Sequence, residues 1–264
     1  MPMLSIRHAA VAGLFYPDQP EPLRRELADL FAANDAVSEG PAPKALIVPH
    51  AGYIYSGPVA ARAYRLLAPV REQIKRVVLL GPAHRVWLEG MAVPSAAAFA
   101  TPLGRVELDR ESIDQIADMA GVGVSDVAHD REHSLEVQLP FLQMMLDDFR
   151  LVPVAVGDCP AGQVGAVIDT LWGGAETLIV VSSDLSHFLD YEHARETDAR
   201  TRDKILEHCD RLDGREACGA RAINGLMHSA AARDLTVEVV DLRNSGDTAG
   251  DHRRVVGYGS FALR

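Results

Sequence analysis

Three histidines stand where they can do chemistry, because His50, His84 and His187 each follow a separate hydrophobic run, in KALIVPH, KRVVLLGPAH and TLIVVSSDLSH. Neutral imidazole binds Zn, Fe, Cu and Ni, and an imidazole that titrates near neutral pH is also a general acid or base. A single histidine after a strand is usually a hydrogen-bonding loop residue. Three in the same relation to three independent runs indicate a shared site.

The runs before these histidines are typical of strands buried on both faces, since they are short, rich in Val, Ile and Leu, and do not alternate with polar residues. Helical patterns lie between them, which predicts a three-layer α/β/α fold with a mostly parallel mixed sheet. We expect strands within 44–50, 75–84, 150–158, 177–187 and 235–242, and helices within 21–33, 57–70, 133–146, 161–172, 192–208 and 215–233.

Two segments carry more specific expectations. The last run, RRVVGYGSFALR, alternates, so it is expected at a sheet edge or in antiparallel pairing. Pro140 lies inside a helical pattern, and a proline inside a helix removes a hydrogen bond and clashes with the preceding turn. That helix is therefore predicted to begin near Pro140 or to be kinked there.

The carboxyl ends of parallel strands are where such sheets bind ligands. We expect His50 and His84 to be metal ligands there, and two histidines with one carboxylate form the ligand set of non-haem Fe(II) oxygenases. His187 is expected to be either a third ligand or a general acid/base beside Asp184. For Asp184 a role as an orienting partner and a role as a helix cap both stay open.

Two further stretches supply candidates for a substrate pocket. HAGYIYSG places Tyr53 and Tyr55 just after the first histidine, as an aromatic wall or as ordinary packing. EHSLEVQLPF places His133 and Glu136 at a helix start, where they either contact a substrate or a metal ligand, or belong to a capping arrangement.

The turn-rich segment RNSGDTAGD follows the run at 235–242 and contains Asp247, a candidate carboxylate ligand. A surface hairpin would have the same composition. The sequence has no Gly-x-Gly-x-x-Gly, Walker, Gly-x-Ser-x-Gly or His-Glu-x-x-His motif, so nucleotide cofactors and serine hydrolase chemistry have no support.

Composition narrows the class of protein. A formal net charge of −11 argues against nucleic-acid binding, and no apolar stretch approaches the ~18 residues that span a bilayer. The start MPMLSIRHAAVAGLFY lacks a signal peptide's apolar core, so a cytoplasmic location is expected. Three cysteines without CxxC spacing are expected to be reduced. Nothing resembling a linker divides residues 1–264, which predicts a single domain.

Five ordered motifs resemble the Memo family, whose bacterial members are called AmmeMemoRadiSam system protein B. They are PHAGYIYSGPVAARAY, LGPAHRVWLEGMAVP, EHSLEVQLPFLQ, VVSSDLSHF and RNSGDTAGD, and IRHAAVAGLFYP is similar to that family's amino-terminal segment. The resemblance implies the fold of class III extradiol (LigB-type) dioxygenases, which hold Fe(II) and cleave catechol rings with O2.

Carried over through these motifs, His50 and His84 fall on the metal-ligand histidines, and His187, with Asp184 nearby, falls on the acid/base position. Animal members of the family have a cysteine immediately before the RN of RNSGD, and this sequence has Leu242 there. Leucine cannot bind a metal. Asp247, a few residues along the same loop, is the expected substitute.

Two classes of function follow from the residues and the resemblance together. The first is a metal-dependent oxidoreductase of dioxygenase type that acts on a small aromatic substrate. Its Fe(II), or else Cu, is expected to be bound by the two histidines and a carboxylate, either Asp247 or Asp184. The second is a non-catalytic accessory protein that binds a metal, a ligand or a peptide, working with a radical-SAM partner. Zinc-dependent hydrolysis in the same cleft is a third, weaker reading.

Overall fold

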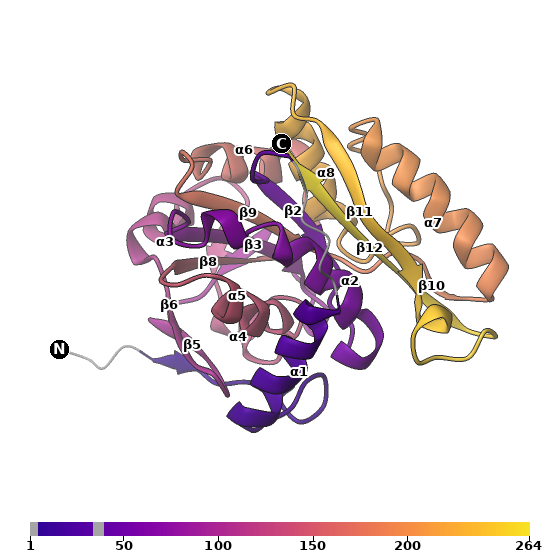
Figure 1. Cartoon of the computed structure of the whole chain (residues 1–264). Coiled ribbons are helices and arrows are strands. Elements are labelled where there is room, and N and C mark those ends of the chain that lie inside the picture. Colours follow the sequence, from indigo (N-terminus) through magenta and orange to yellow (C-terminus); the bar gives the residue numbers. More distant parts are fainter. Residues whose placement is uncertain (1–4, 34–39) are drawn as a thin grey trace.

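The computed structural model describes residues 5–33 and 40–264; residues 1–4, at the start of the segment considered for a signal peptide, lie outside that range. A nine-stranded mixed sheet runs through the centre (Figure 1), in the order β10-β12-β2-β9-β3-β8-β4-β7, with β11 also paired to β12. The strand at one end of this order, β10, spans His187–Leu189. Its parallel core consists of β2 (Ala45–Val48), β9 (Thr177–Ser182), β3 (Arg76–Pro82) and β8 (Arg150–Val156).

These four strands are the predicted hydrophobic runs, and their interior position explains their composition. Every residue of β9 is buried, and Val180 and Val181 have no exposed surface. Burial of such a side chain contributes roughly 1.5–3 kcal/mol, so a strand between two helical layers gains from apolar residues on both faces. The parallel register brings the carboxyl ends of β2 and β9 together, with Val48 opposite Ser182.

Two carboxyl-terminal strands complete this side of the sheet. β12 (Val255–Leu263) pairs antiparallel with β2 and with β11 (Val237–Asn244), as its alternating pattern allows. Of the two expected arrangements, antiparallel pairing is confirmed and the edge position is not, because β12 lies between neighbours and is almost wholly buried. The run at 235–242 was expected to be buried on both faces, yet most of β11 is only partly buried.

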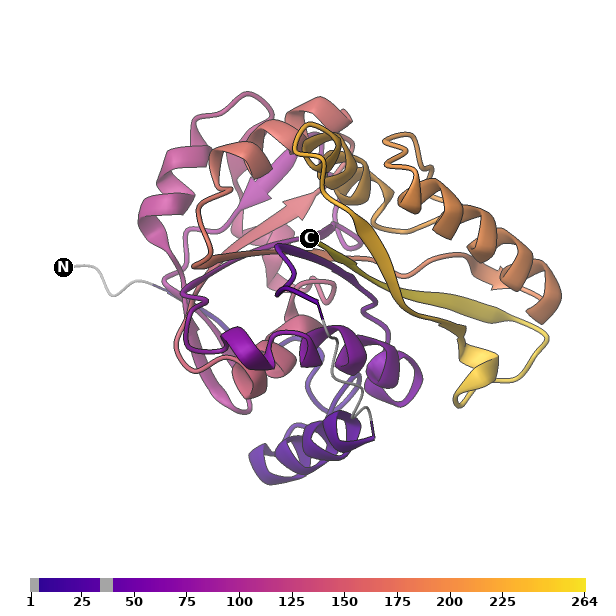
Figure 2. The ribbon, with the colours of Figure 1, turned by 45° about the horizontal axis from the view of Figure 1, so that its top comes forward.

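Helices cover both faces of the sheet, as Figure 2 shows, which confirms the three-layer α/β/α prediction. One layer contains α1 (Pro20–Ala32), α2 (Tyr53–Arg65) and α5 (Leu139–Met145), which contact one another. The other contains α6 (Ala161–Thr170), α8 (Ala220–Ala231) and α7 (Tyr191–Leu206), with α8 against β3 and β9 and α7 against β11 and β12.

Helix starts differ from the sequence pattern at two places and agree at one. α2 begins at Tyr53, before the expected 57, because the Tyr53 N–H donates to the Phe15 carbonyl and fixes the first turn. α8 begins only at Ala220. Pro140 stands in the first turn of α5, where its missing N–H costs nothing, so the expected late start is confirmed.

The segment between residues 91 and 130 holds elements that the sequence did not predict. β4 (Met91–Val93) and β7 (Val122–Val124) extend the sheet beyond β8. β5 (Ala98–Thr101) and β6 (Gly104–Glu107) form a separate three-stranded sheet with β1 (Ile6–Arg7), which comes from the start of the chain. Two short helices, α3 (Arg110–Ala117) and α4 (Asp126–Asp130), complete it. Strands of three or four residues are too short to give a periodic signal.

Candidate metal centre

Three histidines from three parts of the chain meet at the carboxyl edge of the sheet. His50 follows β2, His84 follows β3, and His133 precedes the short helix η2 (Glu136–Gln138). Their ring centroids lie 5.2 Å (His50 to His84), 5.5 Å (His50 to His133) and 4.7 Å (His84 to His133) apart. One potential ligand atom from each lies within 4.8 Å of the other two, which is a grouping that can hold a metal ion.

A hydrogen-bond network fixes the tautomer of His50. The Ser182 hydroxyl donates to the Ser134 carbonyl at 2.6 Å and accepts from the Gln138 amide at 2.8 Å. The hydroxyl proton is therefore used, so the 2.9 Å contact between Ser182 Oγ and His50 Nδ1 requires an N–H on Nδ1. A neutral His50 consequently presents the lone pair of Nε2, which is the form that binds metals.

Glu132 orients His84 in the same manner. Its buried carboxylate accepts from the His84 backbone N–H at 2.5 Å, from His84 Nδ1 at 3.0 Å and from the Ser134 N–H at 2.8 Å. Burial raises the pKa of Glu132, but the hydrogen bonds and charge of His84 outweigh burial and lower it to about 2. An ionised carboxylate holding the far nitrogen of a histidine is the usual support of a metal ligand.

His133 is partly buried, and one of its ring nitrogens is buried without a hydrogen bond. Its Nδ1 has no hydrogen-bond partner, although Glu132 Oε1 lies 3.3 Å away, and the Phe15 ring packs against the imidazole. Burial lowers the pKa of His133 to about 4 and the pKa of His50 well below its ordinary value. Both rings are therefore neutral at pH 7 and suited to metal ligation.

Asp184 and His187 both lie near this group but make separate hydrogen bonds. Asp184 Oδ1 accepts the His50 backbone N–H at 2.8 Å, so it holds the loop that carries His50, and burial raises its pKa to about 6. His187 Nδ1 contacts the Leu185 carbonyl at 2.8 Å. The charge of His187 lowers the pKa of both Asp184 and His50, but His187 stands outside the group of three histidines, so its expected role as a third ligand is not supported.

Asp247 lies in a different arrangement from the one expected of a ligand. Its Oδ1 accepts from the Tyr191 hydroxyl at 2.6 Å, and its Oδ2 accepts the Asn244 N–H at 2.9 Å, closing a capping box on η3 (Ser245–Asp247). In the part of the chain that the structure describes, the ligand group consists of the three histidines. His133 thus stands where a carboxylate was expected.

Two expected pocket residues are committed to the core instead. Glu136 is fully buried and accepts hydrogen bonds from the Ala10 and Val11 amides and from Arg7, which ties the amino-terminal segment to η2. Tyr53 is 1% exposed, and its hydroxyl donates to the Val137 carbonyl at 2.8 Å. Their oxygen atoms are occupied, so neither presents a free group to a substrate.

Tyr55 differs from Tyr53, since 39% of its surface is exposed. The two tyrosines are two residues apart in α2, and side chains at that spacing on a helix do not face the same way. Tyr55 therefore remains available to a ligand, while Tyr53 packs against Phe141 and Tyr16.

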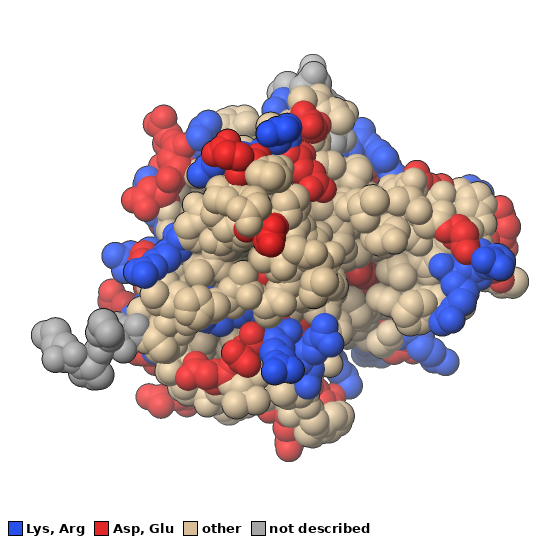
Figure 3. All heavy atoms as spheres, turned by 90° about the horizontal axis from the view of Figure 1, so that it is seen from below, with Lys and Arg blue, Asp and Glu red and all other residues tan. Residues whose placement is uncertain are grey.

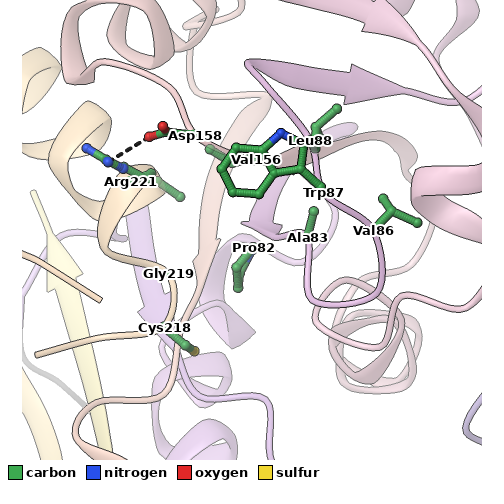
Figure 4. Close-up of a pocket in the computed structure, with 12 residues that line it drawn as sticks. Pro82, Ala83, Val86, Trp87, Leu88, Val156, Asp158, Cys218, Gly219 and Arg221 are labelled. Carbon is green, nitrogen blue, oxygen red and sulfur yellow. Dashed lines mark hydrogen bonds and ion pairs between the residues drawn. The ribbon is translucent and has the colours of Figure 1, made fainter. Parts of the chain in front are cut away.

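Cys218 also reaches His50, and no pattern in the sequence marks it as a site residue because it follows no strand. Its Sγ lies 3.3 Å from His50 Nε2, and burial raises the pKa of the thiol. The cysteine lines a pocket of about 400 Å³ (Figure 4), in which Trp87 lies on one side and the Arg221–Asp158 ion pair, at 2.7 Å, on another. All three cysteines are free thiols.

The surface near the carboxyl edges carries charges of both signs. Figure 3, a view from below, shows Lys and Arg interspersed with Asp and Glu around a largely uncharged centre. His187 lines a cavity of about 640 Å³ together with Arg200, Lys204, Arg215, Asp213 and Glu216.

None of the described helices is both long and apolar enough to cross a membrane.

Comparisons with known proteins cover almost the whole chain. The model of a family described as "Memo-like protein" matches residues 7–262. A MEMO1 family protein of Aquifex aeolicus is 36% identical over 97% of this chain and 98% of its own, and one of Archaeoglobus fulgidus is 36% identical over 98% of this chain and 100% of its own. A solved structure of an uncharacterized Escherichia coli K12 protein covers 81% of this chain and 98% of its own, at 14% identity and a TM-score of 0.48.

Proposed function

This chain belongs to the Memo family, and from that premise we propose that it is a metal-dependent oxidoreductase of the extradiol dioxygenase type, which holds Fe(II) through His50, His84 and His133. The observation that carries the proposal is the histidine group itself, with potential ligand atoms within 4.8 Å of one another. Imidazole ligands suit iron, copper and zinc alike.

The group fits a metal better than it fits a purely structural cluster. Buried polar atoms are nearly always hydrogen-bonded, yet His133 Nδ1 has no partner. His50 and His133 are neutral at pH 7, so neither of these two rings opposes a cation by charge repulsion. The supports at Ser182 and Glu132 leave Nε2 of His50 and of His84 free for ligation.

The chain's own residues would position the substrate and move its proton. Bound Fe(II) supplies the redox chemistry with O2 and open positions for ligands. His187 donates its Nδ1 proton to a carbonyl, so in its neutral form Nε2 has a lone pair that can accept the proton of an acidic substrate hydroxyl. Asp184 keeps His50 in place through its backbone N–H, and the exposed Tyr55 offers an aromatic surface.

A second candidate is zinc-dependent hydrolysis, favoured by one specific observation. Three histidines without a carboxylate ligand are a ligand set of catalytic zinc, which then activates a water molecule. An accessory protein that keeps the metal without turnover would have the same ligands. Metal content and turnover therefore need separate measurements.

The test of the metal site uses tag-free protein, dialysed against each of Fe(II), Cu and Zn under anaerobic conditions and analysed for bound metal. Wild type is expected to retain about one equivalent, and His50→Ala, His84→Ala and His133→Ala are expected to lose it. His193→Ala is the matched control, because that exposed ring pairs with Asp190 on the surface. Unchanged metal content in the three site variants would refute the ligand assignment.

The reaction is tested on the same preparations. Fe(II)-loaded protein is mixed with a panel of catechols in air, and both O2 consumption and ring-cleavage absorbance are followed. Turnover that disappears in His187→Ala while the metal is retained would support the oxidoreductase. Full metal occupancy without turnover on any catechol would favour the hydrolase or the accessory protein, which ester hydrolysis by the zinc form distinguishes.

A further inference from the structure

We propose that Cys218 is a fourth ligand, binding as a thiolate to the metal that His50, His84 and His133 hold. The inference rests on the proposed metal site and adds to it a sulfur donor from the segment before α8. The sulfur changes which metals the site prefers, because thiolate is a soft ligand that favours Zn and Cu(I) over hard cations.

The spacing between Cys218 and His50 is already that of two ligands. Metal–nitrogen bonds of about 2.0 Å and metal–sulfur bonds of about 2.3 Å at a tetrahedral angle separate the two ligand atoms by about 3.5 Å. The Sγ of Cys218 lies 3.3 Å from His50 Nε2. Since Nδ1 of His50 is engaged with Ser182, Nε2 is also the atom with which His50 would bind a metal.

The thiol and a metal compete for the same lone pair. In a neutral His50, Nε2 carries no proton, so the 3.3 Å contact is an S–H donated by Cys218. A metal bound at Nε2 removes this acceptor. The other acceptors near the sulfur, the Asp184 carbonyl at 3.7 Å and Ser183 Oγ at 3.9 Å, are both more distant, and the Asp184 N–H donates to the sulfur at 3.3 Å.

Ligation solves that conflict without any change of oxidation state. The S–H bond breaks, the proton leaves to solvent, and a sulfur lone pair forms the bond to the cation. A buried thiolate is unfavourable alone, but a cation at bonding distance neutralises its charge. The pocket that Cys218 lines gives the proton and the ion a route between this sulfur and solvent (Figure 4).

The backbone around Cys218 is fixed against the end of β9, which holds the sulfur beside His50. The sulfur lies outside the group of atoms within 4.8 Å of one another, so the Cys218 side chain must turn toward the other two histidines to bind the same metal. The Cys218 N–H donates to the Asp184 carbonyl at 3.2 Å, and the Gly219 N–H donates to Ser183 Oγ at 2.8 Å. A Cβ on Gly219 would lie 2.7 Å from the Ser182 carbonyl oxygen and from Ser183 Cβ. Only glycine permits this approach, which is why Cys218 sits so close to His50.

The experiment replaces the native metal with Co²⁺, whose bond to a thiolate gives an intense near-ultraviolet charge-transfer band. Wild type is expected to bind one equivalent and to show the band. Cys218→Ser is expected to lose the band and to bind Co²⁺ at least about tenfold more weakly. Cys209→Ser is the matched control, a free cysteine beyond the end of α7, and is expected to keep both band and affinity.

Two results would overturn the inference while leaving the histidine site intact. One is wild type that binds a full equivalent of Co²⁺ without a sulfur band. The other is a band that persists in Cys218→Ser. The first needs no variant, so it holds even if Cys218→Ser fails to fold, as circular dichroism would reveal. Failure of wild type to bind any Co²⁺ would instead refute the proposed metal function, and this inference with it.

Discussion

Replacing Glu132 with glutamine tests whether the buried carboxylate sets the metal affinity. The carboxylate accepts three hydrogen bonds, two from His84 and one from Ser134. A glutamine has the same shape, but only its oxygen accepts, so its NH2 group must face at least one of these donors. Loss of one charged hydrogen bond with a donor facing another donor costs about 2–4 kcal/mol.

Part of that cost appears in metal binding, because His84 is no longer held with Nε2 free. Loss of such a supporting partner weakens metal affinity about ten- to a hundredfold, which corresponds to about 1.4–2.7 kcal/mol. Isothermal titration with Zn²⁺ measures the affinity, and urea denaturation of metal-free protein measures the free energy of unfolding. Glu111→Gln, on the exposed side of α3, is the control. Glu132→Gln with wild-type affinity and stability would refute the account of how His84 is oriented.

Three other predictions concern stability. Burial raises the pKa of Asp198 to about 6, although a hydrogen bond from the Ser186 N–H opposes it. The folded state therefore binds this proton more tightly than the unfolded chain, so the free energy of unfolding falls by about 3 kcal/mol as pH rises from about 4 to about 6. Asp198→Asn should not show this fall when the free energy of unfolding is measured by urea denaturation across the same pH range. A variant with the same pH dependence as wild type would contradict the prediction. Gly157→Ala should lower the free energy of unfolding by at least about 1–3 kcal/mol, since its Cβ would lie 2.0 Å from the Leu88 carbonyl oxygen. Gly162→Ala is the control, because the space around Gly162 is open. Equal melting temperatures of the two variants would contradict this prediction. Glu136→Gln should lower the free energy of unfolding by about 3–5 kcal/mol, because it leaves Arg7 buried without its counter-charge. It should also speed hydrogen exchange of the backbone amides at residues 6–16, which Glu136 attaches to η2. Exchange as slow as in wild type would contradict this role of Glu136.

The fold was largely predictable because its central strands are buried on both faces. β2, β3, β8 and β9 read as unbroken apolar runs, and the residues that follow two of them deliver His50 and His84 to one place. The short strands of the 91–130 segment were missed because three or four residues carry no period. For β12 the alternating pattern left an edge position and antiparallel pairing both open, since alternation does not distinguish an edge from a position between half-buried partners.

The site was predictable only where residues follow a strand. His133 lies in a loop before a short helix, and its approach to His84 depends on the turn at Glu132 that no periodicity announces. Cys218 is 168 positions from His50 in sequence, and only the close packing at Gly219 brings them together. Asp247 was chosen by proximity to Leu242, but its carboxylate is used in a local capping box.

Anomalous diffraction from crystals loaded anaerobically with Fe(II) tests the central claim most directly. Data collected on both sides of the iron absorption edge locate the metal without assuming its ligands. We predict one strong peak, within bonding distance of Nε2 of His50, Nε2 of His84 and an imidazole nitrogen of His133. A fully loaded crystal whose peak lies elsewhere, for example beside Asp247, would contradict the account.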